Sequence, residues 1–435
     1  MPLKRIWHGI SAVIWPLTFS RRQPTHTTMT ATHAPDSSYA WFRLMISLLL
    51  ATIGGIGIWS CVIILPYIQQ EFGVDRAGAS LPYTVTTIGF ALGGVMGGRL
   101  ADRFGITVPL VIAAVGLGAG LVLGALSQSY LQFLVIQAAI VGFIGCSATF
   151  GPLVADVSQW FLKRRGMAVA IVASGNYVAG TIWPPILEGA ASAYGWRSAF
   201  VALGIFCVVT MLPLAMLLRE RPHFDDRASP AAGHAKGLLP ASPLLYPALV
   251  FAGLACCVAM SMPQVHIVAY CTDLGYGPAV GATMLSMMLG FGVVSRLLSG
   301  YFSDYLGGAG TLIIGSVLQA LALLFYIPFD GLVPLYVVSA IFGLAQGGIV
   351  PSYALIIRDH YPAREAGFRI SMVFTSTVLG MALGGWMSGE IFDYTGSYTA
   401  AFLNGFVWNL LNMSVAAWVL SGRLKNRPPL LPVAA

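Results

Sequence analysis

Arg296 is the residue whose type and position most strongly predict a chemical role. It lies in an apolar run from Pro278 to Phe302 that contains no acidic residue at membrane depth to neutralise it. A cation at the centre of a membrane-spanning helix costs about 2.5–3.5 kcal/mol, so it persists where it faces a cavity and meets a negative group. An anionic ligand is the simplest missing partner. The alternative is structural, with Arg296 snorkelling to a membrane surface or donating hydrogen bonds to carbonyl groups of neighbouring helices.

Polar side chains in other apolar stretches are candidates to line the same cavity. They are Trp59, Tyr83, Asn176, Tyr177, Gln264, His266, Gln346, Tyr353 and Asn404. Such groups also bond between helices at modest benefit, about 0.6 kcal/mol on average in one measured protein, so a structural role is the alternative for each. His266 is distinctive because imidazole titrates near neutral pH. It follows Pro263 in a helix expected to break there, and a neutral interhelical histidine is the other interpretation.

The composition predicts membrane-spanning helices as the elements that position these residues. The chain is 57% hydrophobic and 9% charged, with 50 glycines and a mean hydropathy of +0.79, which excludes a soluble globular domain. Apolar stretches of about 20 residues, long enough to cross about 30 Å of hydrocarbon, occur twelve times, and alternating strand patterns are missing, so we expect an all-α membrane protein. The expected spans are 43–66, 80–100, 107–126, 131–154, 166–187, 198–218, 243–270, 279–302, 310–329, 333–357, 369–389 and 399–421.

The distribution of basic residues predicts the orientation. With a cytoplasmic N-terminus, every Lys and Arg except Arg76, Arg197 and Arg296 falls on the cytoplasmic side. The positive-inside rule therefore predicts a multi-pass protein of the plasma (inner) membrane with both termini in the cytoplasm. The net charge of +7 predicts contact with anionic membrane lipids, not with nucleic acid. The six cysteines show no metal-ligand spacing, so no metal is expected.

An internal repeat predicts two homologous halves. The segment Gly98 to Gly105, GRLADRFG, follows the second span, and Gly300 to Gly307, GYFSDYLG, follows the eighth. We therefore expect a tail at 1–40, six-helix halves at 41–218 and 243–421, a linker at 219–242 and a tail at 422–435. Transporters built from such repeats bind substrate near the membrane midplane and expose the site alternately to each side.

At these residues the chain resembles the major facilitator superfamily over roughly residues 41–425. The pattern Gly-x-x-x-Asp-Arg-x-Gly at Gly98 to Gly105 is similar to its signature between helices two and three. A carboxylate at this place can hold a helix N-terminus through its dipole and pair with cytoplasmic Arg residues, which biases one conformation. We therefore expect gating roles for Gly98, Asp102, Arg103 and, in the second copy, Asp304. The alternative is a solvated tight turn with a capping Asp.

A narrower resemblance lies at Trp160 to Gly175, WFLKRRGMAVAIVASG. It is similar to the motif that leads into helix five in the monocarboxylate porter family, which includes oxalate/formate-antiporter-like members. The resemblance implies that Arg296 binds a substrate carboxylate. Lys163, Arg164 and Arg165 are expected to anchor the loop at anionic headgroups, and the last two to take part in gating. The chain departs from the family at Gly292, where proton-coupled animal members carry Asp, and it has no second cation within 370–387.

The predicted function is secondary active transport of a small organic anion, most simply a monocarboxylate, by a monomer that needs no cofactor. Protons are a candidate coupling ion. Acidic residues cluster at helix ends and loops, so His266 is the expected protonatable group within the spans. The acidic residues expected on the outer side are Glu71, Asp75, Glu188, Asp273, Asp330, Glu390 and Asp393. No phosphate-binding loop or converging catalytic set is recognisable, so no enzyme activity is expected. The alternatives are a proton-driven drug or metabolite efflux antiporter and a non-transporting membrane nutrient sensor.

Overall fold

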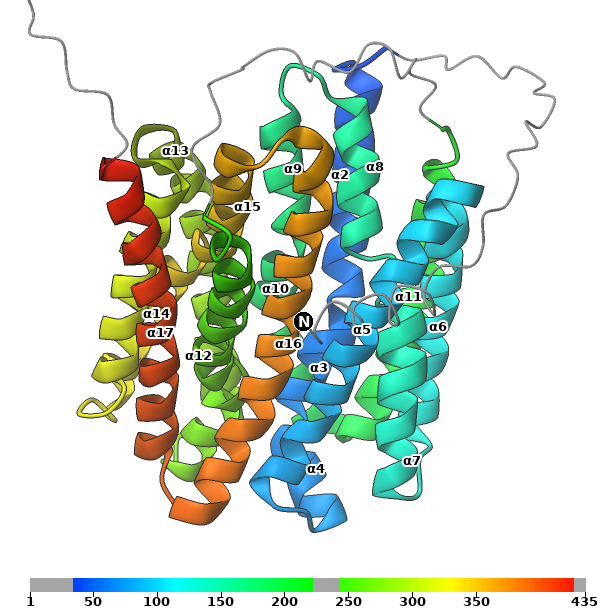
Figure 1. Cartoon of the computed structure of the whole chain (residues 1–435). Coiled ribbons are helices and arrows are strands. Elements are labelled where there is room, and N and C mark those ends of the chain that lie inside the picture. The colour runs from blue at the N-terminus through cyan, green and yellow to red at the C-terminus, as the bar shows by residue number, and fades with distance from the viewer. Residues whose placement is uncertain (1–33, 222–241, 426–435) are drawn as a thin grey trace, which may run out of the picture. The chain divides into compact units, whose positions relative to one another are not determined.

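A computed structural model describes residues 34–221 and 242–425, without the side chains of residues 304, 363, 364 and 423–425. This part of the chain consists of helices and their connections (Figure 1). Within it, eleven helices are long and apolar enough to cross a membrane, and Tyr130–Gly145 is a shorter apolar helix. The expected all-helical fold is therefore confirmed, because every backbone N–H and C=O inside a bilayer must be satisfied within its own segment.

The first six spans, which we call the N-terminal half, run from α2 to α11. Their bounds are α2 (Ser38–Gly54), α3 (Ile56–Ile63), α4 (Leu65–Phe72), α5 (Arg76–Phe104), α6 (Thr107–Ala125), α7 (Tyr130–Val135), the π-helix η1 (Ile136–Gly145), α8 (Gly151–Trp160), α9 (Arg165–Ala173), α10 (Gly175–Tyr194) and α11 (Trp196–Leu217). The expectation of one continuous helix over 131–154 is wrong, because residues 146–150 are not helical. A Cβ atom on Gly142 would lie 2.4 Å from the Thr86 carbonyl oxygen, so close packing on α5 accompanies the irregular π-helix.

The last six spans, the C-terminal half, run from α12 to α17. Their bounds are α12 (Leu245–Asp273), α13 (Pro278–Phe325), α14 (Leu332–Gln346), α15 (Ile349–His360), α16 (Ala363–Thr395) and α17 (Tyr398–Lys425). Helix α13 holds two expected spans, separated at Gly307 by a φ of 69° that favours glycine. The expected break at Pro263 is wrong, since α12 continues through it, as membrane helices tolerate when neighbours satisfy the freed carbonyl.

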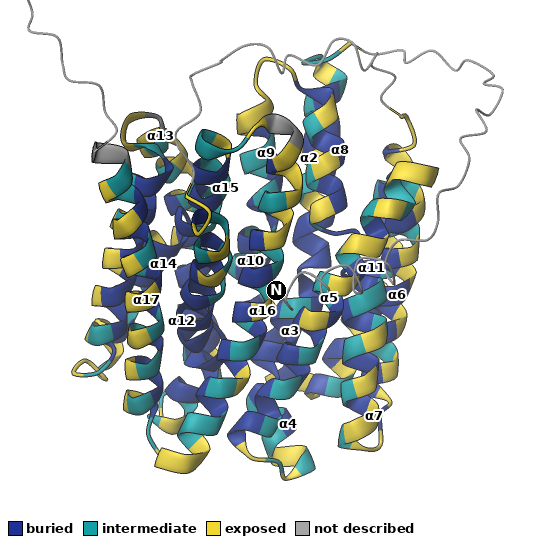
Figure 2. Ribbon diagram, in the orientation of Figure 1, coloured by how far each residue is buried: buried dark blue, intermediate teal, exposed yellow. Residues whose placement is uncertain are grey.

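The two ends of the helices differ in charge. The connection between α8 and α9 lies at the end that we call the basic end, at the top of Figure 1, and its sequence includes Lys163, Arg164 and Arg165. Asp273 and Asp393 lie at the opposite end, which we call the acidic end. Figure 2 shows buried residues along the inward faces of the helices and exposed residues outside. Exposed apolar side chains are expected on a surface covered by lipid.

The two halves meet along two helix pairs, α5 with α16 and α10 with α13. Both pairs combine one helix from each half. They therefore define the interface along which a site between the halves can be opened or closed.

Candidate functional site

Arg296 bridges the two halves from helix α13. Its Nη1 donates to the carbonyl oxygen of Ala173 at 2.8 Å, and its Nε donates to that of Gly347 at 3.4 Å. Ala173 ends α9 and Gly347 follows α14, and the last carbonyl groups of a helix lack intrahelical partners and carry the negative end of its dipole. No carboxylate among the described residues pairs with Arg296. The guanidinium is thus partly held by carbonyl groups, as the structural interpretation expected, while its charge is not neutralised.

The ring of Tyr177 covers the guanidinium of Arg296. The Arg296 Cζ lies 4.4 Å from the ring centroid, within the range of a cation–π contact. A Cβ atom on Gly292 would lie 2.6 Å from the Tyr177 ring and 3.4 Å from Gln346 Nε2. The absence of a side chain at position 292 therefore makes room for both groups one turn away from Arg296.

A pair of glutamines and a tryptophan complete this group. Gln264 Nε2 donates to Gln346 Oε1, while the buried Gln346 Nε2 has no partner among the described residues. Trp59 Nε1 donates to the Asn176 carbonyl oxygen at 3.0 Å and to Asn176 Oδ1 at 3.2 Å. We call the six predicted residues brought together here the Arg296 cluster: Trp59, Asn176, Tyr177, Gln264, Arg296 and Gln346.

His266 and Tyr83 belong to a different group, on the side of α16. His266 Nε2 lies 2.7 Å from the Gly385 carbonyl oxygen, and a Cβ atom on Gly385 would lie 3.2 Å from the Tyr83 ring. A carbonyl oxygen only accepts, so Nε2 carries the hydrogen. The buried Nδ1 has no partner among the described residues. This arrangement matches the interhelical interpretation of His266, and substrate contact by either residue stays a prediction.

Within the described part of the chain, Asp102 and Arg103, for which gating roles were expected, form no hydrogen bond or ion pair with the other half at the basic end. Asp102 and Arg103 are exposed, and the Arg103 guanidinium lies 5.1 Å from the centroid of the neighbouring Phe104 ring. Asp102 makes no ion pair or hydrogen bond with another described residue, and a Cβ atom on Gly98 would meet no atom within 4 Å. The side chain of Asp304 lies outside the described part of the chain. The gating roles expected of Gly98, Asp102, Arg103 and Asp304 stay predictions.

The loop before α9 is held by a residue that the sequence did not single out. The carboxylate of Asp36 accepts hydrogen bonds from the backbone N–H groups of Leu162, Lys163 and Arg164 at 3.1, 3.0 and 3.4 Å. Burial by itself would raise the pKa of Asp36, but these N–H groups hold the pKa below its usual value. The loop is therefore fixed through its backbone.

The side chains of Arg164 and Arg165 contact residues of their own half. The Arg164 guanidinium lies 6.0 Å from the centroid of the Trp41 ring. Arg165 Nη2 donates to Ser158 Oγ at 3.3 Å. The gating roles expected of Arg164 and Arg165 stay predictions.

The halves are joined at the acidic end by a set of contacts that sequence reasoning missed. Asp393 on α16 accepts from the backbone N–H groups of Arg76 and Ala77 at 2.9 and 2.7 Å. Arg76 Nη2 forms an ion pair with Asp273 Oδ2 on α12 at 2.7 Å. A carboxylate is stabilising at a helix N-terminus, where N–H groups lack partners. We call Arg76, Ala77, Asp273 and Asp393 the acidic-end lock.

A sequence signal for this lock exists. Asp393 stands three residues before Gly396, the left-handed C-cap of α16. Asp102 stands in the same relation to Gly105 at the end of α5. Helices α5 and α16 therefore each carry a carboxylate near the C-terminus, and only the one at the acidic end is bound to a helix N-terminus here.

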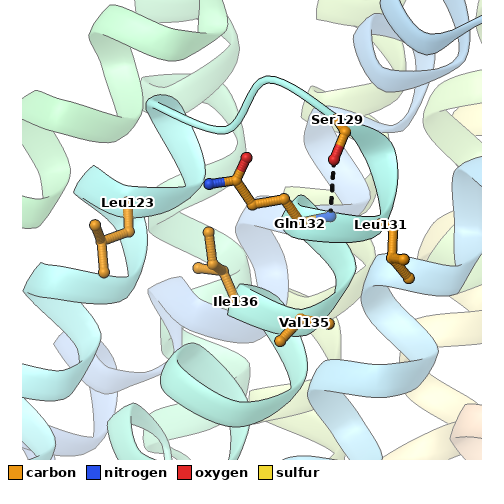
Figure 3. A pocket seen from close by; sticks show the side chains of 6 residues that line it. All are labelled: Leu123, Ser129, Leu131, Gln132, Val135 and Ile136. Atoms are coloured by element: carbon orange, nitrogen blue, oxygen red, sulfur yellow. Dashed lines mark hydrogen bonds between the residues drawn. The ribbon is translucent and has the colours of Figure 1, made fainter.

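A surface hollow at the acidic end is a poor candidate for the site. It is lined by Leu123, Ser129, Leu131, Gln132, Val135 and Ile136 (Figure 3). Its one hydrogen bond between lining residues, from Gln132 N to Ser129 Oγ at 3.3 Å, caps α7. The other lining residues are apolar, and the hollow holds no charged group. It is therefore suited to lipid contact, not to an ionic substrate.

A family comparison identifies the scaffold that carries the Arg296 cluster. The family model of the Major Facilitator Superfamily matches this chain at residues 47–334 and 311–435. The chain belongs to the Major Facilitator Superfamily. The twelve-helix fold and the function of a membrane transporter follow from this membership and from the apolar helices. As a superfamily member it is an integral multi-pass membrane protein.

Individual relatives have low sequence identity to this chain, but the alignments cover most of it. Monocarboxylate transporter 13 of Rattus norvegicus is 23% identical over 381 residues, which cover 86% of this chain and 87% of the relative. The agnestins efflux protein of Paecilomyces divaricatus is 25% identical over 313 residues, which cover 71% and 69%. A solved bacterial homologue of the human lysosomal transporter Spinster aligns with a TM-score of 0.65 at 17% identity, covering 91% of this chain and 100% of that one. At this identity the last similarity supports the superfamily fold alone.

Proposed function

We propose that this superfamily member transports small organic monoanions, with monocarboxylates as the main class. The observation that supports the proposal is Arg296, a cation at membrane depth between the two halves with no carboxylate partner among the described residues. Its guanidinium can meet a carboxylate through two parallel hydrogen bonds if it releases the carbonyl groups of Ala173 and Gly347. The similarity to a monocarboxylate transporter adds independent support.

The number of cations sets the expected specificity. The Arg296 cluster contains one cation, and its other members are neutral. A second carboxylate of the same ligand would be buried without a partner, at a cost of several kcal/mol. Monocarboxylates are therefore favoured over dicarboxylates.

The mechanism is alternating access between the two halves. The two halves contact each other at the acidic end through the acidic-end lock. At the basic end, Asp102 does not form the expected contact with another described residue. If the basic end is cytoplasmic, as the positive-inside rule predicts, this conformation is closed to the outside. The acidic-end lock must then break in each transport cycle.

Uptake into vesicles tests the proposed function. The purified full chain, reconstituted in proteoliposomes, is expected to take up labelled L-lactate in a saturable manner. Unlabelled monocarboxylates should compete, and oxalate and succinate should not. Strong, saturable inhibition by a dicarboxylate would contradict the one-cation argument. Efflux from preloaded vesicles, measured in parallel, distinguishes uptake from the export suggested by the efflux relative.

Replacing Asp393 by Asn is expected to shift the protein toward the conformation that is open at the acidic end. The change removes a charge from the α5 N-terminus, an effect worth about 1–2 kcal/mol, so the ratio of the two conformations should change roughly 5- to 30-fold. Spin-label distances between α5 and α16 at the acidic end would measure the shift.

Asp330→Asn is the matched control, because Asp330 is exposed at the same end and its carboxylate makes no ion pair with another described residue. Asp102→Asn should slow transport without opening the acidic end. Equal distance distributions in Asp393→Asn and wild-type protein would refute the lock.

A further inference from the structure

Glu188 is a buried carboxylate in a position where the sequence predicted an outside group. It lies on α10 about two turns before the helix ends at Tyr194, but its residue is only 2% exposed. Oε1 accepts a hydrogen bond from the Tyr67 hydroxyl at 2.9 Å. Oε2 is buried and has no partner among the described residues. The sequence placed Glu188 just beyond the end of the expected span 166–187, whereas the structure places it within α10 and buries it.

Helical periodicity places Glu188 on the same face of α10 as the Arg296 cluster. Tyr177, Thr181 and Glu188 follow at spacings of four and seven residues, which lie on one face of an α-helix. Tyr177 contacts Arg296, and the Thr181 carbonyl oxygen accepts from the Ser286 hydroxyl on α13. This face of α10 therefore meets the C-terminal half. Glu188 lies along it, about 16 Å of helix from Tyr177 toward the acidic end.

No cation is available to neutralise Glu188 among the described residues. Helices α2, α3, α9, α11 and α13 pack against α10. The arginine on each of these helices has another partner. Arg43 on α2 pairs with Asp156, and Arg197 on α11 pairs with Glu71. Arg165 on α9 donates to Ser158, Arg296 on α13 contacts Tyr177, and α3 carries no charged residue. On α4, which holds Tyr67, the one charged residue is Glu71. An ionised Glu188 would be an uncompensated buried charge, whereas the protonated acid would be neutral.

We propose that Glu188, held by Tyr67, is the site that carries a coupling proton. This inference rests on the proposed anion transport. A proton from water at the open acidic end binds Oε2, forming an O–H bond and changing the carboxylate from −1 to neutral. The same halves that rock around Arg296 then expose Glu188 to the other side, where the proton returns to water. One proton and one monoanion together carry no net charge through the membrane interior.

Two variants and one control test the site without any substrate. Infrared pH titration of the full chain in lipid membranes should show a protonated carboxyl band from a buried acid. Glu188→Gln should remove this band, and Tyr67→Phe should shift it because one hydrogen bond is lost. Glu390→Gln should leave it unchanged, since Glu390 lies at the acidic end of α16 without an ion pair to another described residue. Identical spectra for wild type and Glu188→Gln would overturn the inference.

Transport in proteoliposomes tests the coupling separately. With Glu188→Gln, accumulation of labelled L-lactate driven by a pH gradient should fall at least about tenfold, while exchange of L-lactate across the membrane continues. Glutamine keeps an acceptor for Tyr67 and resembles the neutral acid, so the variant is expected to fold. Undiminished pH-driven accumulation in Glu188→Gln would overturn the coupling role. If wild type shows the Glu188 band but moves no monocarboxylate, the proposed substrate class fails and the proton site stands.

Discussion

Replacing Arg296 by Ala is expected to abolish saturable monocarboxylate uptake while the protein still folds and inserts. The guanidinium is the one cation of the Arg296 cluster, and charge-assisted hydrogen bonds contribute about 1.5–3 kcal/mol each. Arg296→Lys retains the positive charge but loses the planar guanidinium group, which can donate two parallel hydrogen bonds to a carboxylate. Lysine should therefore weaken binding roughly 10- to 100-fold, which corresponds to about 1.4–2.7 kcal/mol. Binding measured by substrate-dependent thermal stabilisation and uptake in vesicles would report both effects.

Arg369→Ala is a matched control for this prediction. Arg369 also contacts tyrosine rings, at 4.8 Å from the Tyr246 centroid and 4.1 Å from the Tyr361 centroid, but it lies outside the Arg296 cluster. Its loss should leave substrate affinity within about twofold of wild type. Normal monocarboxylate transport by Arg296→Ala would mean that Arg296 only joins helices through the carbonyl groups of Ala173 and Gly347.

Replacing Asp156 by Ala is expected to lower the free energy of unfolding by about 3–5 kcal/mol, because it leaves the buried cation of Arg43 without its partner. The pair is bidentate, with Arg43 Nε to Asp156 Oδ2 and Nη2 to Oδ1 both at 2.9 Å. Nη2 also donates to the Leu218 carbonyl oxygen at 3.2 Å. These bonds join α2, α8 and the end of α11. Denaturant unfolding of the purified protein in detergent would measure the loss.

The control is Glu365→Gln, which removes the pair between Glu365 and Arg369. These side chains are 50% and 26% exposed, and such i,i+4 pairs contribute about 0.3–0.5 kcal/mol. Replacing Arg43 and Asp156 together by Met and Leu should recover much of the stability, since no charge then remains buried. A loss in Asp156→Ala no larger than in Glu365→Gln would show that the pair does not stabilise the fold.

The break in the fourth span and the continuity of α12 show where sequence patterns fail to predict helix continuity. Hydropathy averages over about 20 residues and is insensitive to a few non-helical positions such as 146–150. Pro263 predicts a break from local chemistry alone, yet α12 continues through it. Neighbouring helices decide such cases, because they supply or deny the contacts that replace a lost backbone hydrogen bond.

By itself the sequence determined that this is an all-α multi-pass membrane protein, and it predicted two related six-helix halves and an unneutralised cation at Arg296. These properties follow from the composition, the length of the apolar segments and the repeated motifs, all of which can be read from the order of residues in the chain. Only the tertiary structure decided which groups meet. Arg76 and Asp393 are 317 positions apart, and Tyr67 and Glu188 are 121 apart. Such partners depend on how each helix is rotated and on which helices are neighbours. The partners that meet in the acidic-end lock and the burial of Glu188 were therefore beyond the reach of the sequence pattern, whereas Arg296 and the carboxylate near the end of α16 were within it.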